Sequence, residues 1–160
     1  MLMRNAAEIF AADEFIEGDT NFPLFNADLQ DAEGIPPAVQ KLSDQIAAAD
    51  AVIISTPEYN KAISGSLKNA LDWVSRTEGN PWKDKPLAIM SAAAGRAGGE
   101  RSQFSLRLAM MPFRTHILQG PEVLVGGSSN EFDENGKLTG ETYVKFLTEL
   151  MDELRAAIRR

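Results

Sequence analysis

Hydrophobic positions recur at helical spacing in five parts of the sequence. Near the start, apolar residues at positions 2, 6, 9 and 10 share one face, so the chain opens inside a helix. A later pattern begins at Pro36 and Pro37, which suit the first turn of a helix because no N–H is required there. The predicted helices cover 2–10, 36–49, about 64–76, 100–111 and 143–158.

Four short extended segments lie between these helices. Ala51–Ser55 is a continuous apolar run rich in β-branched residues, as expected for a parallel strand covered on both faces. Pro86–Met90 and Glu122–Val125 are predicted as further strands, and Glu14–Asp19 alternates and is predicted as a short, weak strand. The stretch 20–37, rich in Pro and Gly, is expected to be an irregular surface loop.

The alternation of helices and strands favours an α/β sandwich with a mostly parallel sheet. The length of 160 residues suits a single domain that covers 1–160. We expect the strands around 51–55 and 86–90 to be adjacent, with the loops that follow them at the same end of the sheet.

Composition and charge exclude several classes of protein. Sixteen Lys and Arg against 23 Asp and Glu give a net charge of −7, so nucleic acid is not an expected partner. No apolar run approaches the ~20 residues that span a bilayer, and the N-terminus does not resemble a signal peptide. We therefore expect a cytoplasmic protein without a membrane partner. The absence of cysteine excludes disulfides, a thiolate nucleophile and Cys-ligated metals.

Two loops carry the candidate chemistry, because ligands of open parallel sheets bind outside the carboxyl ends of the strands. The first, TPEYN, offers the aromatic hydroxyl of Tyr59 and the amide of Asn60. The second, SAAAGRAGG, consists of small residues that let backbone N–H groups approach a flat ligand. The two loops could hold a planar heteroaromatic ring, although on composition alone an ordinary strand-to-helix turn is the simpler interpretation of TPEYN.

The remaining polar residues offer little chemistry of their own. His116 is the only histidine, and neither a nearby carboxylate nor a metal-ligand spacing distinguishes it from a structural residue. GRAGG lacks the Gly-Lys-Ser/Thr ending of a phosphate loop. If the protein is an enzyme, a cofactor is expected to supply the chemistry.

Two segments resemble a known family. TPEYNKAISGSLKNALDWVSR (56–76) closely resembles the signature of the NADPH-dependent FMN reductases, which include flavin-dependent quinone, chromate and azo reductases. SAAAGRAGGERSQFSLR (91–107) resembles the second block of that family, and PLFNADL and PEVLVGG are similar to further family segments.

The resemblance implies a flavodoxin-like three-layer sandwich that binds FMN and passes electrons from NAD(P)H to a quinone or a similar small acceptor. It implies that the flavin, rather than a catalytic side chain, carries the chemistry. The residues that it assigns to the cofactor are Thr56, Pro57, Glu58, Tyr59, Asn60, Ser91, Ala92, Ala93 and Gly95. It also implies a homodimer or homotetramer, with Arg101 near the contacts. Four residues are candidates to cover apolar surface there: Trp73, Phe104, Met110 and Met111.

One part of the family pattern is not found. The family begins with a strand and a G-S-x-R-x-x-S-x-N loop that binds the FMN phosphate, whereas Met1 falls within the first helix. We therefore expect the first strand to be missing from the sheet and FMN to bind more weakly than in the family. Two alternatives stay open: a flavodoxin-like electron carrier, and a truncated non-catalytic member without bound flavin.

Overall fold

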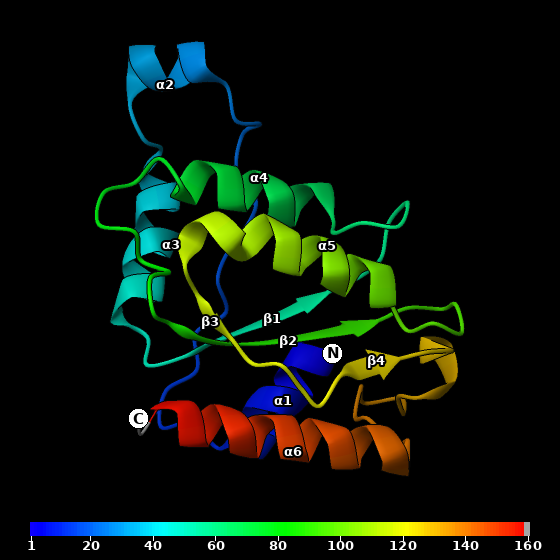
Figure 1. Ribbon diagram of the computed structural model, residues 1–160. Coiled ribbons are helices and arrows are strands. Elements are labelled where there is room, and N and C mark those ends of the chain that lie inside the picture. The colour runs from blue at the N-terminus through cyan, green and yellow to red at the C-terminus, as the bar shows by residue number, and fades with distance from the viewer. Residues whose placement is uncertain (159–160) are drawn as a thin grey trace.

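The computed structural model describes residues 1–158, and a four-stranded parallel sheet forms its centre (Figure 1). The strands are β1 (Val52–Thr56), β2 (Pro86–Ala92), β3 (His116–Ile117) and β4 (Val123–Val125). β2 pairs with all three of the others: β1 lies along one edge of β2, and β3 and β4 share the other edge. The predicted parallel pairing of the strands around 51–55 and 86–90 is therefore confirmed.

Residues 1–158 form six α-helices, and all of them except the second cover the two faces of the sheet (Figure 1). They are α1 (Leu2–Phe10), α2 (Ala27–Glu33), α3 (Pro37–Ala48), α4 (Gly65–Val74), α5 (Glu100–Met110) and α6 (Glu141–Ile158), with 3₁₀ turns η1 (Met111–Phe113) and η2 (Ser128–Asn130). Figure 1 shows α3, α4 and α5 on one side of the sheet and α1 and α6 on the other. The predicted three-layer sandwich is confirmed.

A separate hydrophobic core fills the space on each side of the sheet. Successive side chains of a strand point to opposite faces, so Leu87 and Ile89 of β2 enter the core beneath α3, α4 and α5. Ala88 and Met90 enter the core beneath α1 and α6. All four residues are buried, which explains why this strand is a continuous apolar run rather than an alternating one.

Short polar side chains determine where two of the helices begin. The Ser64 hydroxyl accepts a hydrogen bond from the amide of Leu67 at 3.3 Å and so caps α4. The Asn26 side chain accepts one from the amide of Asp28 at 2.8 Å and caps α2.

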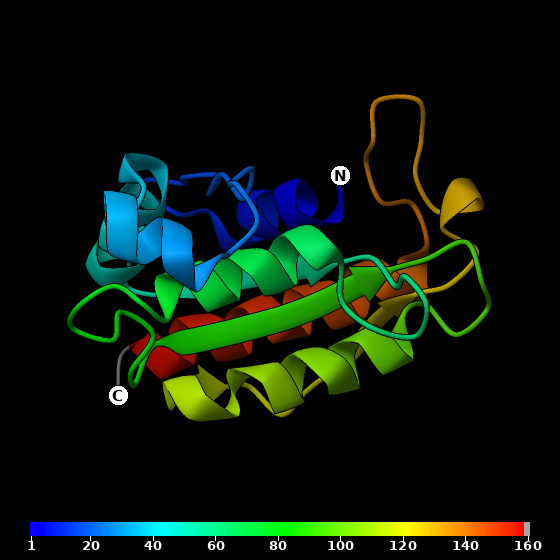
Figure 2. The ribbon, with the colours of Figure 1, turned by 90° about the horizontal axis from the view of Figure 1, so that it is seen from above.

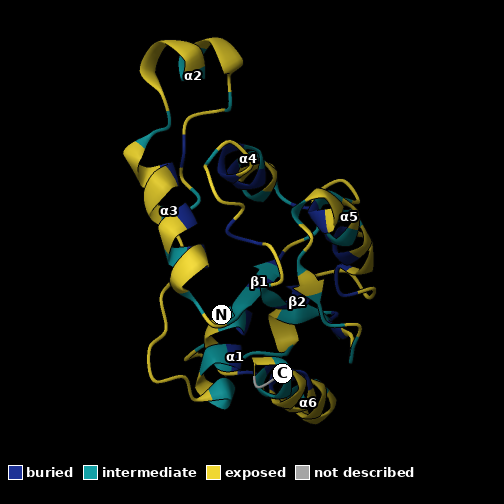
Figure 3. Ribbon diagram, turned by 60° about the vertical axis from the view of Figure 1, so that its left-hand side comes forward, coloured by how far each residue is buried: buried dark blue, intermediate teal, exposed yellow. Residues whose placement is uncertain are grey.

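Three details of the fold differ from the sequence-based predictions. Glu14–Asp19 is not a strand: it has no regular structure, and its residues are exposed. A strand needs the free edge of a neighbour, and within residues 1–158 none pairs with this segment. The stretch 20–37 contains the helix α2, which projects from the body with no buried residue (Figure 3). The two-residue strand β3 was not predicted.

Within the described residues, no helix is both long enough and apolar enough to cross a membrane.

Candidate functional site

The loops that follow β1 and β2 leave the sheet at the same end, as predicted. β1 and β2 are parallel neighbours with Thr56 beside Ser91, so both chains emerge side by side. Figure 2 shows the two loops beyond the arrowhead of β2. This end of an open parallel sheet is where such folds bind ligands.

The first loop ends in a tight hairpin that fixes its tip. Tyr59 and Ala62 exchange two backbone hydrogen bonds of 3.0 Å, with Asn60 and Lys61 as the turn residues. Asn60 has φ 50° and Lys61 φ 67°, the left-handed conformations of a type I′ hairpin turn. Asn tolerates this conformation well, and Lys much less so. Tyr59 is 61% exposed, so the hairpin presents its aromatic ring to solvent.

Two other side chains of the first loop point inward. Thr56 is buried, and its hydroxyl donates to the carbonyl of Pro57 at 2.9 Å. The Glu58 carboxylate accepts hydrogen bonds from the amides of Arg101 at 3.1 Å and Ser102 at 3.4 Å, in the first turn of α5. Glu58 therefore attaches the loop to α5, whereas the hydrogen bond of Thr56 lies within the loop itself.

The second loop is held down by a buried polar network. Ser91 is completely buried, and its hydroxyl donates to the carbonyl of Gly98 at 2.6 Å. The Gln103 amide donates to the Ser91 hydroxyl and to the carbonyl of Val123, both at 2.9 Å. Gln103 thereby joins α5 to β2 and β4. Gln103 lies within the family-like segment 91–107, but nothing in that pattern predicted this role.

Gly98 is required where this loop packs on β4. Its φ is +60°, and a Cβ built on it would lie 2.4 Å from the carbonyl carbon and oxygen of Leu124. No side chain fits at that distance, so only glycine lets the loop lie this close to the strand. The loop backbone is thus fixed by direct contact with the sheet.

The remaining loop surface is open and lined by small residues. Ala92 and Ala93 are partly buried, and Gly95 is exposed, with no atom of the described residues within 4 Å of the position of a Cβ. Within residues 1–158, the backbone amides of Glu58 and of 94–97 have no hydrogen-bond partner. Free amides beside small residues suit a flat ligand whose edge carries oxygen and nitrogen acceptors, and the isoalloxazine ring of FMN has this chemistry. The residues present therefore fit the ring portion of FMN.

The predicted cofactor residues fall into two groups. Pro57, Tyr59, Asn60 and Gly95 are exposed, and Ala92 and Ala93 are partly accessible at the same end of the sheet. Thr56 and Ser91 have buried, hydrogen-bonded side chains, and Glu58 caps α5. The assignment of all nine residues to FMN stays a prediction, as does the missing first strand with its weaker FMN binding.

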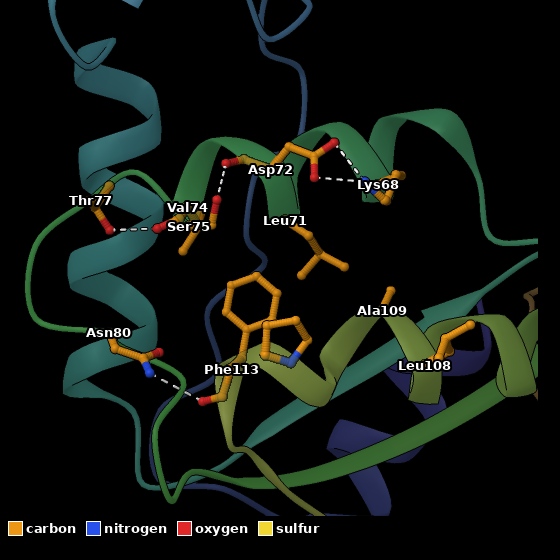
Figure 4. A pocket seen from close by; sticks show the side chains of 11 residues that line it. Lys68, Leu71, Asp72, Val74, Ser75, Thr77, Asn80, Leu108, Ala109 and Phe113 are labelled. Atoms are coloured by element: carbon orange, nitrogen blue, oxygen red, sulfur yellow. Dashed lines mark hydrogen bonds and ion pairs between the residues drawn. The ribbon is translucent and has the colours of Figure 1, made fainter. Parts of the chain in front are cut away.

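A groove of about 560 Å³ lies elsewhere, between α4 and α5 (Figure 4). Leu71 and Val74 of α4 face Leu108 and Ala109 of α5 across it, and Phe113 closes one end. The Lys68–Asp72 ion pair of 2.7 Å lies on its α4 side. Because the groove lies towards the C-terminal ends of both helices, it is remote from the loops that follow the strands. Within residues 1–158, no three His, Cys, Asp or Glu side chains are grouped to hold a metal.

Residues 2–130 match the NADPH-dependent FMN reductase family. The chain belongs to this family. It is 40% identical over 141 residues to an NAD(P)H-dependent FMN reductase of Pseudomonas aeruginosa, covering 88% of this chain and 76% of that protein. It is 38% identical over 129 residues to a quinone reductase of Escherichia coli K12, covering 80% of this chain and 69% of that protein.

Solved structures of similar proteins confirm the flavodoxin-like fold. FerB of Paracoccus denitrificans, a flavoenzyme NAD(P)H:(acceptor) oxidoreductase, superposes with a TM-score of 0.84 at 30% identity, covering 99% of this chain and 88% of that one. A WrbA-like flavodoxin of Agrobacterium tumefaciens gives a TM-score of 0.56 at 19% identity, covering 98% of this chain and 88% of that one, and supports the fold alone.

Proposed function

We propose that this family member is an FMN-dependent NAD(P)H oxidoreductase that reduces a quinone or a similar small acceptor. The observation that carries the proposal is the pair of loops at one end of the sheet, with their free amides and small residues. When bound, FMN would take two electrons from NAD(P)H and pass them to the acceptor. Membership of the family and the names of the relatives support this activity.

The residues of this chain would hold the flavin rather than react themselves. Pro57, Tyr59 and Asn60 would contact one side of the ring, and Ala92–Gly95 would lie along another. The free amides of these loops would donate to the polar edge of the ring and stabilise the negative charge that reduction adds. Because the hairpin and the buried network already fix both loops, little reorganisation would be needed on binding.

The test is FMN binding and turnover by variants at an open position of the second loop. Gly95→Val adds a side chain where the protein itself has space, so the variant should fold as the wild type does. We expect it to bind FMN at least about tenfold more weakly, because the valine takes the place of the ligand. The matched control is Ala38→Val, an exposed position on α3, which should bind FMN normally.

Two measurements report the outcome: flavin fluorescence for binding, and NADPH consumption with and without a benzoquinone for activity. Equal FMN affinity of Gly95→Val and the wild type would contradict the proposed site. FMN binding without quinone-dependent NAD(P)H oxidation would contradict the reductase and favour a flavodoxin-like electron carrier. No FMN binding by the wild-type chain would favour a non-catalytic member.

We also propose that the chain forms a homodimer or homotetramer through the outer face of α5. Phe104, Leu108 and Met111 are exposed by 56%, 70% and 71%, and their spacing places them on one face beside the α4–α5 groove. Such an apolar stripe is typical of a protein interface. Trp73 and Met110, which were also expected to cover such surface, are instead buried within the chain and cannot take part.

Light scattering of two variants tests this interface. Leu108→Asp should shift the mass towards the 17.5 kDa of one chain, because a carboxylate in an apolar interface loses its hydration. Leu24→Asp is the matched control, since Leu24 is 81% exposed but lies in the irregular segment before α2. A wild-type mass of one chain, or equal masses for the two variants, would contradict the interface.

We propose the cytoplasm as the place of action, because NAD(P)H is produced and recycled there.

A further inference from the structure

The first turn of α5 lacks a capping side chain of its own. The residue before the helix, where Ser, Thr, Asp or Asn usually supplies an oxygen to the first-turn amides, is Gly99. Its φ is +87°, and a Cβ there would lie 2.8 Å from the Cβ of Ser91. The close packing of this turn on β2 therefore rules out any side chain at the usual capping position.

Glu58 supplies the missing cap from the other loop. Its carboxylate oxygen Oε2 accepts hydrogen bonds from the amides of Arg101 and Ser102, the second and third residues of α5 and the two that a cap normally binds. The negative charge also suits the N-terminal end of a helix. Glu58 is 43 residues away from Arg101 in the sequence, and it stands between Pro57 and Tyr59 in the first loop.

This contact joins the two loops of the candidate site. Gly98 and Gly99 end the second loop, and α5 continues from them, so the first turn of α5 moves with that loop. Within residues 1–158, Glu58 makes the only hydrogen bonds between residues 57–61 and residues 93–103. Without Glu58, the first loop would be held by its own strand and hairpin, and the second loop by its contacts with β2 and β4.

We propose that Glu58 is a positioning residue, whose carboxylate sets the separation of the two loops and thereby the width of the FMN ring site. This inference rests on the function proposed above. In this role the Glu58 side chain contacts the protein rather than the ligand. The spacing of the loops therefore depends on an oxygen that accepts the two amide hydrogen bonds, and less on the negative charge.

Three variants separate these roles. Glu58→Ala removes the acceptor. Glu58→Gln keeps an acceptor oxygen of the same reach without the charge. Glu100→Ala removes an acidic side chain from the first turn of α5 that makes no hydrogen bond within residues 1–158, so it serves as the matched control for charge near the helix end.

The first readout is amide hydrogen exchange of the protein without FMN. In Glu58→Ala, the amides of Arg101 and Ser102 should exchange about tenfold or more faster, because they lose their acceptor while the helix cannot replace it. Glu58→Gln and Glu100→Ala should stay near the wild type. Unchanged exchange at both amides in Glu58→Ala would overturn the cap.

The second readout is the Kd for FMN, from flavin fluorescence. Glu58→Ala should bind FMN roughly tenfold more weakly, a change of about 1.4 kcal/mol, whereas Glu58→Gln and Glu100→Ala should stay within about threefold of the wild type.

Faster exchange with an unchanged Kd would overturn the positioning role. Equal losses in Glu58→Ala and Glu58→Gln would also overturn it, because they would show that the charge itself contacts the ligand. A wild-type protein that takes up no FMN would refute the proposed function and with it the positioning of FMN, whereas the exchange data would still decide the cap.

Discussion

Replacing Gln103 by alanine tests the buried link between α5, β2 and β4. Gln103 is 2% exposed, and its side-chain amide donates to the Ser91 hydroxyl and to the Val123 carbonyl, both at 2.9 Å. The alanine variant leaves both acceptors without this donor. A buried polar group that loses its partner costs about 1–3 kcal/mol.

The two acceptors differ in what they retain. The Ser91 hydroxyl still donates to Gly98 in the variant. The cost of removing its Gln103 donor should therefore be near the low end of that range, about 1 kcal/mol. The Val123 carbonyl loses a close partner on the edge of the sheet, and we take about 2 kcal/mol for it. The sum of about 3 kcal/mol should lower the melting temperature by roughly 6–12 °C in a chain of this length.

Urea unfolding followed by circular dichroism measures this loss. Gln103→Met, which keeps most of the volume but donates no hydrogen bond, separates the polar contribution from the cavity. Gln40→Ala is the control. Gln40 is exposed on α3, and within residues 1–158 its side chain bonds only Asp44, so this variant should lose no more than about 0.5 kcal/mol of unfolding free energy. The reasoning fails if Gln103→Met is as stable as the wild type, or if Gln103→Ala loses no more than Gln40→Ala.

Three further results are expected. Lys61→Gly should raise the free energy of unfolding by about 0.5 kcal/mol, because glycine relieves the left-handed strain but gains freedom when unfolded; Lys41→Gly, within α3, should instead lower it by about 1 kcal/mol. Gly98→Ala should destabilise by about 3 kcal/mol or more, since its Cβ would lie 2.4 Å from the β4 backbone; a wild-type urea midpoint would contradict that contact. Arg4 holds the pKa of Glu17 below its ordinary 4.5, mainly through their hydrogen bond, so the contribution of this pair is complete above that pH and is lost as the pH falls through the lowered pKa. Glu17→Gln should therefore differ slightly from the wild type at neutral pH and low salt and converge with it in acid, and a difference that persists in acid would exclude the ion pair as its cause.

Local hydrophobic patterns were sufficient to predict the layers of the fold. β2 is an apolar run because both of its faces are buried. β1 is also an apolar run, and its side chains contact both cores, although only Ile54 and Thr56 are fully buried. The segment Glu14–Asp19 has a strand-like alternation, but no strand among residues 1–158 pairs with it, and a hydrophobic pattern does not show whether a neighbouring strand has a free edge. β3 could not be predicted because its two residues are too few to show the alternation of a strand.

The site was predictable only in part. The order of strands and loops predicted that TPEYN and SAAAGRAGG would meet at one end of the sheet, which the parallel register confirms. The inward roles of Ser91 and Glu58 depend on partners 7 and 43 residues away, in contacts that exist only after the chain has folded. A polar residue in a loop motif therefore gives no indication of whether it faces a ligand or the protein.

The place of β2 in the sheet has a consequence for how the protein loses its structure. β1, β3 and β4 each pair with β2, and the two faces of β2 supply both hydrophobic cores. Neither core can therefore unfold while the other stays folded, because β2 couples the two sides of the sheet into one cooperative unit. The amides of Leu87–Met90 should exchange with solvent only when the whole molecule unfolds, so their exchange measures the global stability directly.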